Sequence, residues 1–291
     1  MSLNLLPGNW GSRARTIGLS IPSLSGEDIG ARAARAHAEG FSGLELPATG
    51  EPGKLYAPSV RPEERARWRD LLAPFHALSA VAPDKSGFDV SLVSPSAVIR
   101  RASVTEIWSV CRFIEALGGG VVSVRTGWPP AHVEPERARG HLVECLTTLD
   151  RMAGDHNAVI GLEAADYFDD ASRFDLLEMV RLRHTGITLD TRHVSLLRDA
   201  LAEDGAESVV GRFARRFAAR LVHVRVHADE PFAPGLSEDD VADLVAALLE
   251  ANYRGMTCLA FGADFPPREH QVRAQQRAAW EKRMVGAADD R

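Results

Sequence analysis

Charged side chains lie in or at the end of several short apolar runs of this chain, and their types suit proton transfer or metal binding. Carboxylates come late in the runs LELP, VIGLEA and ITLDTRHV, whereas VSVRTG and LVHVRVHAD carry basic side chains. Carboxylates and histidines move protons in enzymes and also hold metal ions. The candidate residues are Glu45, Arg125, Glu163, Asp190, His193, His223, Arg225 and His227.

The elements that must position these residues alternate between strand and helix along the whole chain. Apolar runs predict eight strands, over 15–21, 43–46, 77–82, 121–125, 159–163, 186–190, 220–227 and 256–261. Helical patterns lie between them. One runs from a cap at Ser25 to Glu39, one begins at a capping box at Ser103, and the last follows residue 266. The others cover 63–72, 136–153, 172–182, 206–219 and 237–251.

This alternation predicts a single-domain α/β fold, the (β/α)8 TIM barrel, over residues 1–291. The segment 1–14 is an N-terminal extension, and 265–291 is a terminal helix and tail. Active sites of such barrels lie at the carboxyl ends of the strands, where the candidate residues fall. A terminal helix with Trp280 on one face could also form a subunit contact, so a homo-oligomer is possible.

The composition favours a soluble, cytoplasmic protein. The net charge of -6 argues against a nucleic-acid partner, because binding to a phosphate backbone needs a basic face. No segment approaches about 18 consecutive apolar residues, and the N-terminus has no signal-peptide core, so we expect no membrane partner. The three cysteines are widely spaced without a CxxC pattern, which predicts neither a disulfide framework nor a zinc knuckle.

Several common catalytic motifs are missing from the chain. The phosphate-loop GKS or GKT, the hydrolase GxSxG and the calcium-binding DxDxDG are absent. Glycines 118–120 stand between a predicted helix and a strand, which indicates a helix stop rather than a phosphate loop. None of Lys54, Lys85 and Lys282 falls on a strand, so a Schiff-base aldolase is not expected.

Six segments in a fixed order resemble one family of barrels. The resemblance spans nearly the whole chain and is to the xylose isomerase-like TIM barrels, a group often labelled sugar phosphate isomerase/epimerase. Its markers are GFSGLEL at 40–46, the segment at 94–119, IGLEA at 160–164, LDTRH at 189–193, HVRVHAD at 223–229 and NYRG at 252–255.

The resemblance implies a divalent cation held at the ends of strands 5 to 8. Glu163 and Asp190 match the glutamate and aspartate of strands 5 and 6, and His193 matches a histidine that faces the substrate. The chain departs from the family at the other two ligands, where Arg225 replaces a histidine or glutamine and Ala260 replaces a glutamate.

Three further histidines of the family are also replaced. Val81 and Arg125 stand at the positions on strands 3 and 4, and Phe232 stands after strand 7. Endonuclease IV, which belongs to the same group, needs a rich set of histidines and carboxylates for three zinc ions. The resemblance therefore does not extend to nuclease activity.

Two interpretations of the cation position follow. In one, Glu163, Asp190 and His227 hold manganese, magnesium or zinc in a rebuilt three-ligand site. In the other, which we favour, Arg225 is a fixed positive charge between the carboxylates, and the metal is absent. Residues expected to contact the substrate are Arg125, Arg225, His223, His227, Glu45 and Trp128.

The function that we expect is an isomerase of the intramolecular oxidoreductase or epimerase class in carbohydrate metabolism. Glu163, Asp190 and His193 would carry a proton transfer on a small sugar, keto-sugar or hydroxy-carbonyl compound. One alternative is a catalytically inactive barrel that serves as a small-molecule binder or scaffold. A second is a lyase or hydrolase, such as a dehydratase or a glycoside-cleaving enzyme, on the same fold.

Overall fold

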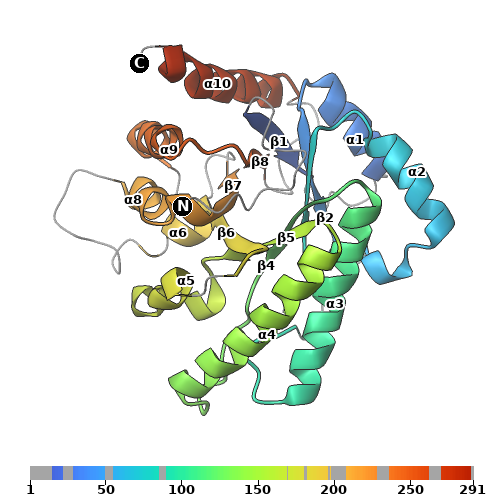
Figure 1. Ribbon diagram of the computed structural model, residues 1–291. Coiled ribbons are helices and arrows are strands. Elements are labelled where there is room, and N and C mark those ends of the chain that lie inside the picture. Colours follow the sequence, from blue (N-terminus) through green and yellow to red (C-terminus); the bar gives the residue numbers. More distant parts are fainter. Residues whose placement is uncertain are drawn as a thin grey trace.

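Eight parallel strands close into a barrel in the order β1 to β8, and helices surround it (Figure 1). The computed structural model describes residues 15–21, 29–49, 55–84, 90–168, 170–179, 182–195, 197, 208–227, 236–261 and 270–289. The extension at 1–14, the Ser25 cap, Phe232 and the start of the predicted helix at 206 lie outside these residues. The predicted (β/α)8 fold is confirmed.

The strands lie within one or two residues of their predicted bounds, because each is an apolar run buried on both faces. They are β1 (Thr16–Ser20), β2 (Gly43–Pro47), β3 (Ala77–Val81), β4 (Gly120–Val124), β5 (Ala158–Glu163), β6 (Thr185–Asp190), β7 (Leu221–His227) and β8 (Met256–Ala260). Register places Asp190 beside Arg225 and Arg225 beside Cys258 on adjacent strands. Asp190 and Arg225 therefore lie side by side on neighbouring strands.

The helices form the outer layer. The described helices are α1 (Ile29–Ala38), α2 (Pro62–Leu72), α3 (Ala97–Ala116), α4 (Pro135–Asp155), α5 (Asp175–Met179), α6 (Thr191–Ser195), α8 (Val209–Arg216), α9 (Glu238–Glu250) and α10 (His270–Asp289). Short 3-10 turns lie at 57–59, 166–168, 171–173 and 218–220. Helices α3 and α4 pack side by side and extend well beyond the strands (Figure 1).

Helix α3 begins earlier than predicted. Ser103 does not cap it, because the helix already starts at Ala97. The Ser103 hydroxyl instead donates to the Ile99 carbonyl one turn back and accepts from the Ser91 amide. The Ser-Val-Thr-Glu sequence that begins at Ser103 has the spacing of a capping box. A serine inside a helix, however, can also donate a hydrogen bond to a carbonyl of the preceding turn.

Two other helices are shorter than predicted. The pattern over 172–182 yields a 3-10 turn and the short helix α5, and that over 206–219 yields α8 followed by a 3-10 turn. In α8, the Ser208 hydroxyl accepts from the Gly211 amide at the helix N-terminus. Ser237 caps α9 in the same way and forms a capping box with Asp240.

The glycine run after α3 is a helix stop. Gly118 and Gly119 have φ values of 111° and 95°, which side-chain-bearing residues rarely adopt. A Cβ at Gly119 would lie 2.7 Å from the Asn157 carbonyl oxygen, whereas a Cβ at Gly118 would meet nothing within 4 Å.

We expect Gly119→Ala to destabilise the protein more than Gly118→Ala. Both variants strain the backbone by about 1 to 2 kcal/mol, but only the first also forces the Asn157 backbone to move. Urea unfolding of both variants measures the difference. Equal losses of unfolding free energy would show that the close approach to Asn157 has no effect.

Helix α10 closes the outer layer between α9 and the first βα unit (Figure 1). Trp280 and Met284 are buried against the rest of the chain, and Arg273 forms a two-pronged ion pair with Glu39. The interpretation of Trp280 as part of a subunit contact is therefore wrong, since this side chain is only 5% exposed within one chain.

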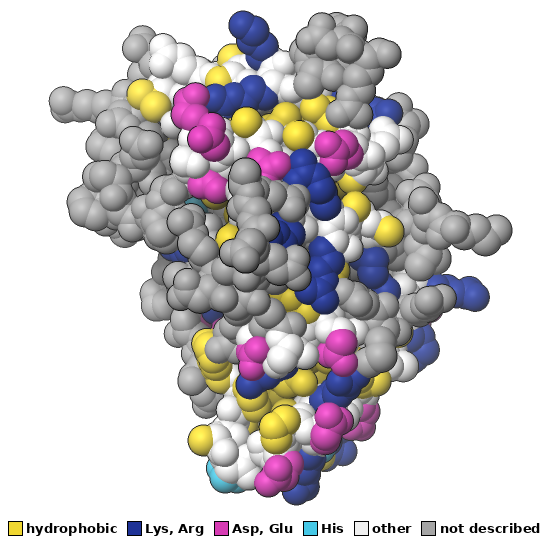
Figure 2. Space-filling view, turned by 90° about the vertical axis from the view of Figure 1, so that its left-hand side faces the viewer, with side chains coloured by type: hydrophobic (Ala, Val, Ile, Leu, Met, Phe, Trp, Pro, Cys, Tyr) yellow, Lys and Arg dark blue, Asp and Glu magenta, His cyan; other side chains and the backbone are white. Residues whose placement is uncertain are grey.

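The face drawn in Figure 2 carries charged side chains of both signs together with hydrophobic ones. On the face in Figure 2, arginine and lysine side chains lie among acidic ones rather than in one basic patch. Among the described helices, none has the length and apolar character needed to cross a membrane.

Candidate functional site

Arg225 lies at the centre of the barrel and binds three carboxylates. Its Nε and Nη2 donate to the two oxygens of Glu45 on β2, at 2.8 and 2.9 Å. Its Nη1 donates to Glu163 Oε1 on β5 and to Asp190 Oδ2 on β6, both at 2.8 Å. Burial lowers the pKa of Arg225, but the three carboxylates raise it well above its ordinary value. The guanidinium is therefore a permanent positive charge.

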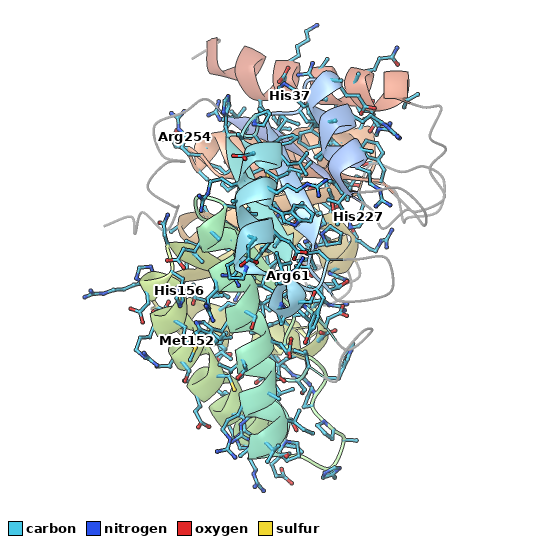
Figure 3. All side chains as sticks on the ribbon, turned by 90° about the vertical axis from the view of Figure 1, so that its right-hand side faces the viewer. His37, Arg61, Met152, His156, His227 and Arg254 are labelled. Atoms are coloured by element: carbon cyan, nitrogen blue, oxygen red, sulfur yellow. The ribbon has the colours of Figure 1, made fainter. Side chains whose placement is uncertain are left out.

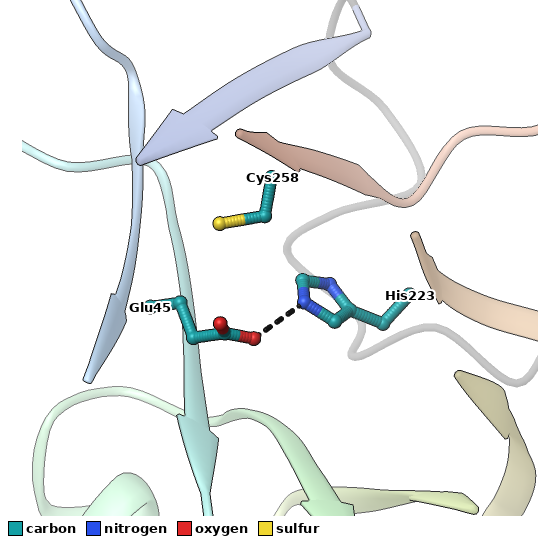
Figure 4. A group of neighbouring side chains, drawn as sticks. All are labelled: Glu45, His223 and Cys258. Carbon is teal, nitrogen blue, oxygen red and sulfur yellow. Dashed lines mark hydrogen bonds and ion pairs between the residues drawn. The ribbon is translucent and has the colours of Figure 1, made fainter. Parts of the chain in front are cut away.

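Glu45 holds one edge of this guanidinium and has no free oxygen. Its Oε1 also accepts from the Ser20 hydroxyl at 2.7 Å, and its Oε2 also bonds to His223 Nε2 at 2.8 Å (Figure 4). Burial raises the pKa of Glu45, but Arg225 and His223 lower it more, so the carboxyl is ionised. Since the carboxylate only accepts, Nε2 of His223 carries the proton.

Asp190 has both oxygens bonded as well. Its Oδ1 accepts from the backbone amides of Arg192 and His193, where the chain turns into α6. Its Oδ2 accepts from Arg225 and bonds to His227 Nε2 at 3.1 Å. Burial acts to raise its pKa, yet His227 and then Arg225 hold the pKa of Asp190 well below its ordinary value.

Glu163 differs from these two carboxylates because one of its oxygens is unused. Oε1 binds Arg225, but Oε2 is buried and has no hydrogen-bond partner among the described residues. The nearest polar group is His193 Nδ1, which lies 3.5 Å from Glu163 Oε2 and 3.7 Å from Asp190 Oδ1. Burial raises the pKa of Glu163, but Arg225 and then His193 lower it below the ordinary value.

His193 is the partly open member of the group, with 22% of its side chain exposed. Burial lowers its pKa, but Glu163 and Asp190 outweigh that effect, so the pKa of His193 is raised. The sequence prediction that these three residues meet at one end of the barrel agrees with their positions.

Protonated His193 should stabilise the fold. Its folded-state pKa is raised, so this contribution is complete below the unfolded-state pKa of about 6.5 and is lost as the pH rises through the folded-state value. We expect the melting temperature of the wild type to fall above about pH 6.5 by more than that of His193→Asn. Thermal unfolding across a pH series tests this. Identical slopes for the two proteins would contradict it.

The rim of the barrel holds a second arginine. Arg125 donates from Nη1 to Asp84 at 3.0 Å and from Nη2 to Asp166 at 2.8 Å, and the Gly127 amide also donates to Asp166. Asp84 and Asp166 were not among the residues predicted for the site. Each follows a strand, which is the one sequence signal that could have found them.

Two further predicted contact residues lie at or just after the end of a strand. Trp128 follows β4 and is 49% exposed. His227 lies at the carboxyl end of β7, and Figure 3 shows it on the opposite side of the molecule from His156 and Arg254, which precede strands β5 and β8. The polar mouth is therefore at the carboxyl ends of the strands, where the chemistry of such barrels is found.

A comparison with known protein families agrees with the barrel fold. The sequence model of the family called xylose isomerase-like TIM barrel matches residues 33–282. The chain belongs to that family. A search of curated proteins returned no match.

Several solved structures are similar to this chain in fold. A D-tagatose 3-epimerase-like protein has a TM-score of 0.72 at 16% identity, covering 94% of this chain and 99% of that one. A D-psicose 3-epimerase from Clostridium cellulolyticum H10 has a TM-score of 0.72 at 15% identity, with coverages of 93% and 99%. A 3-keto-D-glucoside 4-epimerase from E. coli has a TM-score of 0.69 at 16% identity, with coverages of 92% and 99%. At these identities the likeness shows the fold alone.

The divalent cation that this family implies does not fit the residues present. An ion between Glu163 and Asp190 would need oxygens at about 2.0 to 2.6 Å. Arg225 Nη1 already lies 2.8 Å from an oxygen of each, so a cation would meet a positively charged nitrogen. His227, the third ligand of the rebuilt site, bonds to the same Asp190 oxygen as Arg225, and Ala260 has no donor atom.

A second group of possible ligand atoms lies deeper in the barrel, formed by Glu45, His223 and Cys258 (Figure 4). Both oxygens of Glu45 are already bonded. Burial and then Glu45 raise the pKa of the Cys258 thiol well above its ordinary value. Metals bind the thiolate, so this group does not fit a cation either.

Proposed function

We propose that this protein is an isomerase or epimerase that acts by proton transfer at carbon on a small sugar, keto-sugar or hydroxy-carbonyl compound. We propose further that it does so without a resident divalent cation. The observation that carries the proposal is Glu163 Oε2, an ionised carboxylate oxygen with no hydrogen-bond partner among the described residues. In the same cluster, Glu45 and Asp190 have no such oxygen.

The reaction would begin at the carbon next to a carbonyl. Glu163 removes a proton from that carbon, the electron pair of the C–H bond forms a carbon–carbon double bond, and the carbonyl oxygen takes a proton from His193. The product of this step is an enediol. Reversal of the transfers at the neighbouring carbon gives the isomer and returns both residues to their starting states.

The pKa values of the pair suit these roles. Arg225 lowers the pKa of Glu163 and keeps it ionised, whereas the two neighbouring carboxylates raise the pKa of His193 and keep it a proton donor. The same lowering makes Glu163 a weaker base. Separation of the two pKa values in opposite directions is the usual arrangement of an acid and a base that work together.

The charges favour an uncharged ligand. Arg225 is bound to three carboxylates and Arg125 to two, so neither guanidinium brings unbalanced positive charge to the mouth. A phosphate or carboxylate on the ligand would add negative charge beside Glu163 and Asp190.

We therefore expect free ketoses to bind at least tenfold more tightly than their phosphate esters. Calorimetric titration with D-fructose, D-tagatose and their phosphates measures this directly. Tighter binding of the phosphates would mean that an anion-binding group outside the described residues dominates.

The relatives in structure support the substrate class. The structures similar to this chain are of proteins named D-tagatose 3-epimerase-like protein, D-psicose 3-epimerase and L-ribulose 3-epimerase. These names concern uncharged sugars. Uncharged substrates also suit the mouth of this barrel, in which both arginines are already paired with carboxylates.

The decisive experiment follows hydrogen exchange at carbon. The protein is incubated in D2O with a panel of aldoses and ketoses, and proton NMR records loss of the C–H signal next to the carbonyl. Exchange that needs the protein and ceases in Glu163→Gln supports the proposal. Absence of exchange with every sugar that binds would contradict it.

One observation favours a second function, in which the barrel binds a small molecule without turning it over. Glu163 and Asp190 are only 1% and 2% exposed and are both bound to Arg225, which restricts contact with a ligand. Saturable binding of a sugar without any deuterium exchange would establish this alternative.

A further inference from the structure

Arg225 lies between two of the donor residues of the mouth, Glu163 and Asp190. Its Nη1 lies 2.8 Å from Glu163 Oε1 and 2.8 Å from Asp190 Oδ2. Glu163, Asp190 and His193 each offer one ligand atom, and these three atoms lie within 4.8 Å of one another. Such a group could surround a metal ion if the guanidinium were not there.

Two buried atoms of the group also make no hydrogen bond within the described part of the chain. Glu163 Oε2 and His193 Nδ1 make no hydrogen bond with the described residues, although Glu163 is only 1% exposed. Unused polar atoms that are buried are costly, so they usually mark a place for a ligand or ion. The guanidinium satisfies one oxygen of each carboxylate and leaves these two atoms facing each other at 3.5 Å.

Glu45 keeps the guanidinium in this position. It binds the Nε and Nη2 edge of Arg225 through both oxygens, while Ser20 and His223 hold Glu45 itself. The side chain of Arg225 is only 8% exposed. Two-pronged pairing of this kind fixes the plane of the guanidinium as well as its place.

We propose that Glu163, Asp190 and His193 form a closed cation site, which Arg225 fills as a built-in positive charge and Glu45 keeps shut. Replacement of the guanidinium opens this site to a divalent metal ion. The inference concerns the same mouth as the proposed function, but it rests on contacts alone and needs no turnover.

The variant that tests it conserves charge. Glu45→Gln/Arg225→His removes one negative and one positive charge, and the amide introduced at position 45 can still accept from His223 while its NH2 group donates to the Ser20 hydroxyl. The histidine adds a neutral metal ligand beside Glu163 and Asp190. The control is Asp84→Asn/Arg125→His, which makes the same exchange at the rim arginine, whose hydrogen bonds go to Asp84 and Asp166 rather than to the three donor residues.

The measurement is titration with MnCl2 by calorimetry, followed by elemental mass spectrometry after desalting. We expect near one equivalent of manganese in Glu45→Gln/Arg225→His, with loss of at least a hundredfold in affinity when Glu163→Gln is added. The wild type and the rim control should retain none. These results do not depend on finding a substrate, so they stand apart from the test of sugar turnover.

Two outcomes would overturn the inference. One is stoichiometric manganese in the wild type that is lost in Glu163→Gln, which would show that Arg225 does not close the site. The other is a folded double variant that binds no manganese. If the double variant is unfolded, MnCl2 must restore its circular dichroism, because an ion that binds the native state stabilises it. Failure to do so counts against the inference.

Discussion

Glu163→Gln is expected to lower kcat for carbon-bound hydrogen exchange by about 10²- to 10⁴-fold, the usual contribution of a general base. The amide keeps the size of the side chain, and its oxygen can still accept from Arg225 Nη1. It replaces the unused oxygen with a group that cannot take a proton. Because the change affects the transition state more than ground-state binding, KM should change much less than kcat.

The matched control is Glu64→Gln, the same chemical change on α2, where the side chain is 42% exposed and pairs with Arg61 at the surface. It should leave kcat and KM unchanged. Full activity in Glu163→Gln would remove Glu163 from the mechanism and would direct attention to His193 as the base.

Arg225→Met should lower the free energy of unfolding by about 3 to 5 kcal/mol, the usual cost of removing one partner from a buried ion cluster. Methionine fills much of the same space but leaves Glu45, Glu163 and Asp190 without their shared guanidinium. Urea unfolding followed by circular dichroism measures the loss.

Arg61→Met is the control, because the side chain of Arg61 is 74% exposed in its pair with Glu64, and such pairs contribute about 1 kcal/mol or less. Glu45→Gln/Arg225→Met should lose less stability than the sum of its two single changes, since the partners interact directly. A loss in Arg225→Met no larger than that in Arg61→Met would show that the cluster adds little to stability.

The barrel could be predicted from the sequence because its strands leave a simple signal. A strand buried on both faces reads as a short apolar run, and eight such runs alternate with helical patterns. Helix ends were harder to predict. Ser103 has the spacing of a capping box, but its hydroxyl donates to a carbonyl in the preceding helical turn. Whether such a serine caps a helix or bonds within it depends on where the preceding loop packs.

The centre of the site could be predicted in part. The order of the strands placed Glu163, Asp190 and Arg225 at one end of the barrel, and their opposite charges indicated that they would pair. The role of Glu45 could not be read in the same way. Its partner is 180 residues away on β7, which does not pair with β2, and the LELP run does not indicate which strand across the barrel supplies a cation.

The rim pairs were missed for a related reason. Asp166 reaches Arg125 from a turn in which its own backbone has a φ of 56°, a conformation that short polar residues tolerate. No spacing rule connects such a turn residue with an arginine on the previous strand. A prediction of charge pairing across loops needs the loop conformations themselves.

The bond between Glu45 and Arg225 also bears on how the chain unfolds. Glu45 belongs to β2 in the first half of the barrel. The other members of this ion cluster lie in the second half, where Glu163 belongs to β5, Asp190 to β6 and Arg225 to β7. A fragment that held only the first four βα units would bury the Glu45 carboxylate without its guanidinium, and the complementary fragment would leave the Nε and Nη2 groups of Arg225 without their partner. Neither half-barrel therefore has a self-sufficient interior, and unfolding should proceed as one cooperative event rather than half by half.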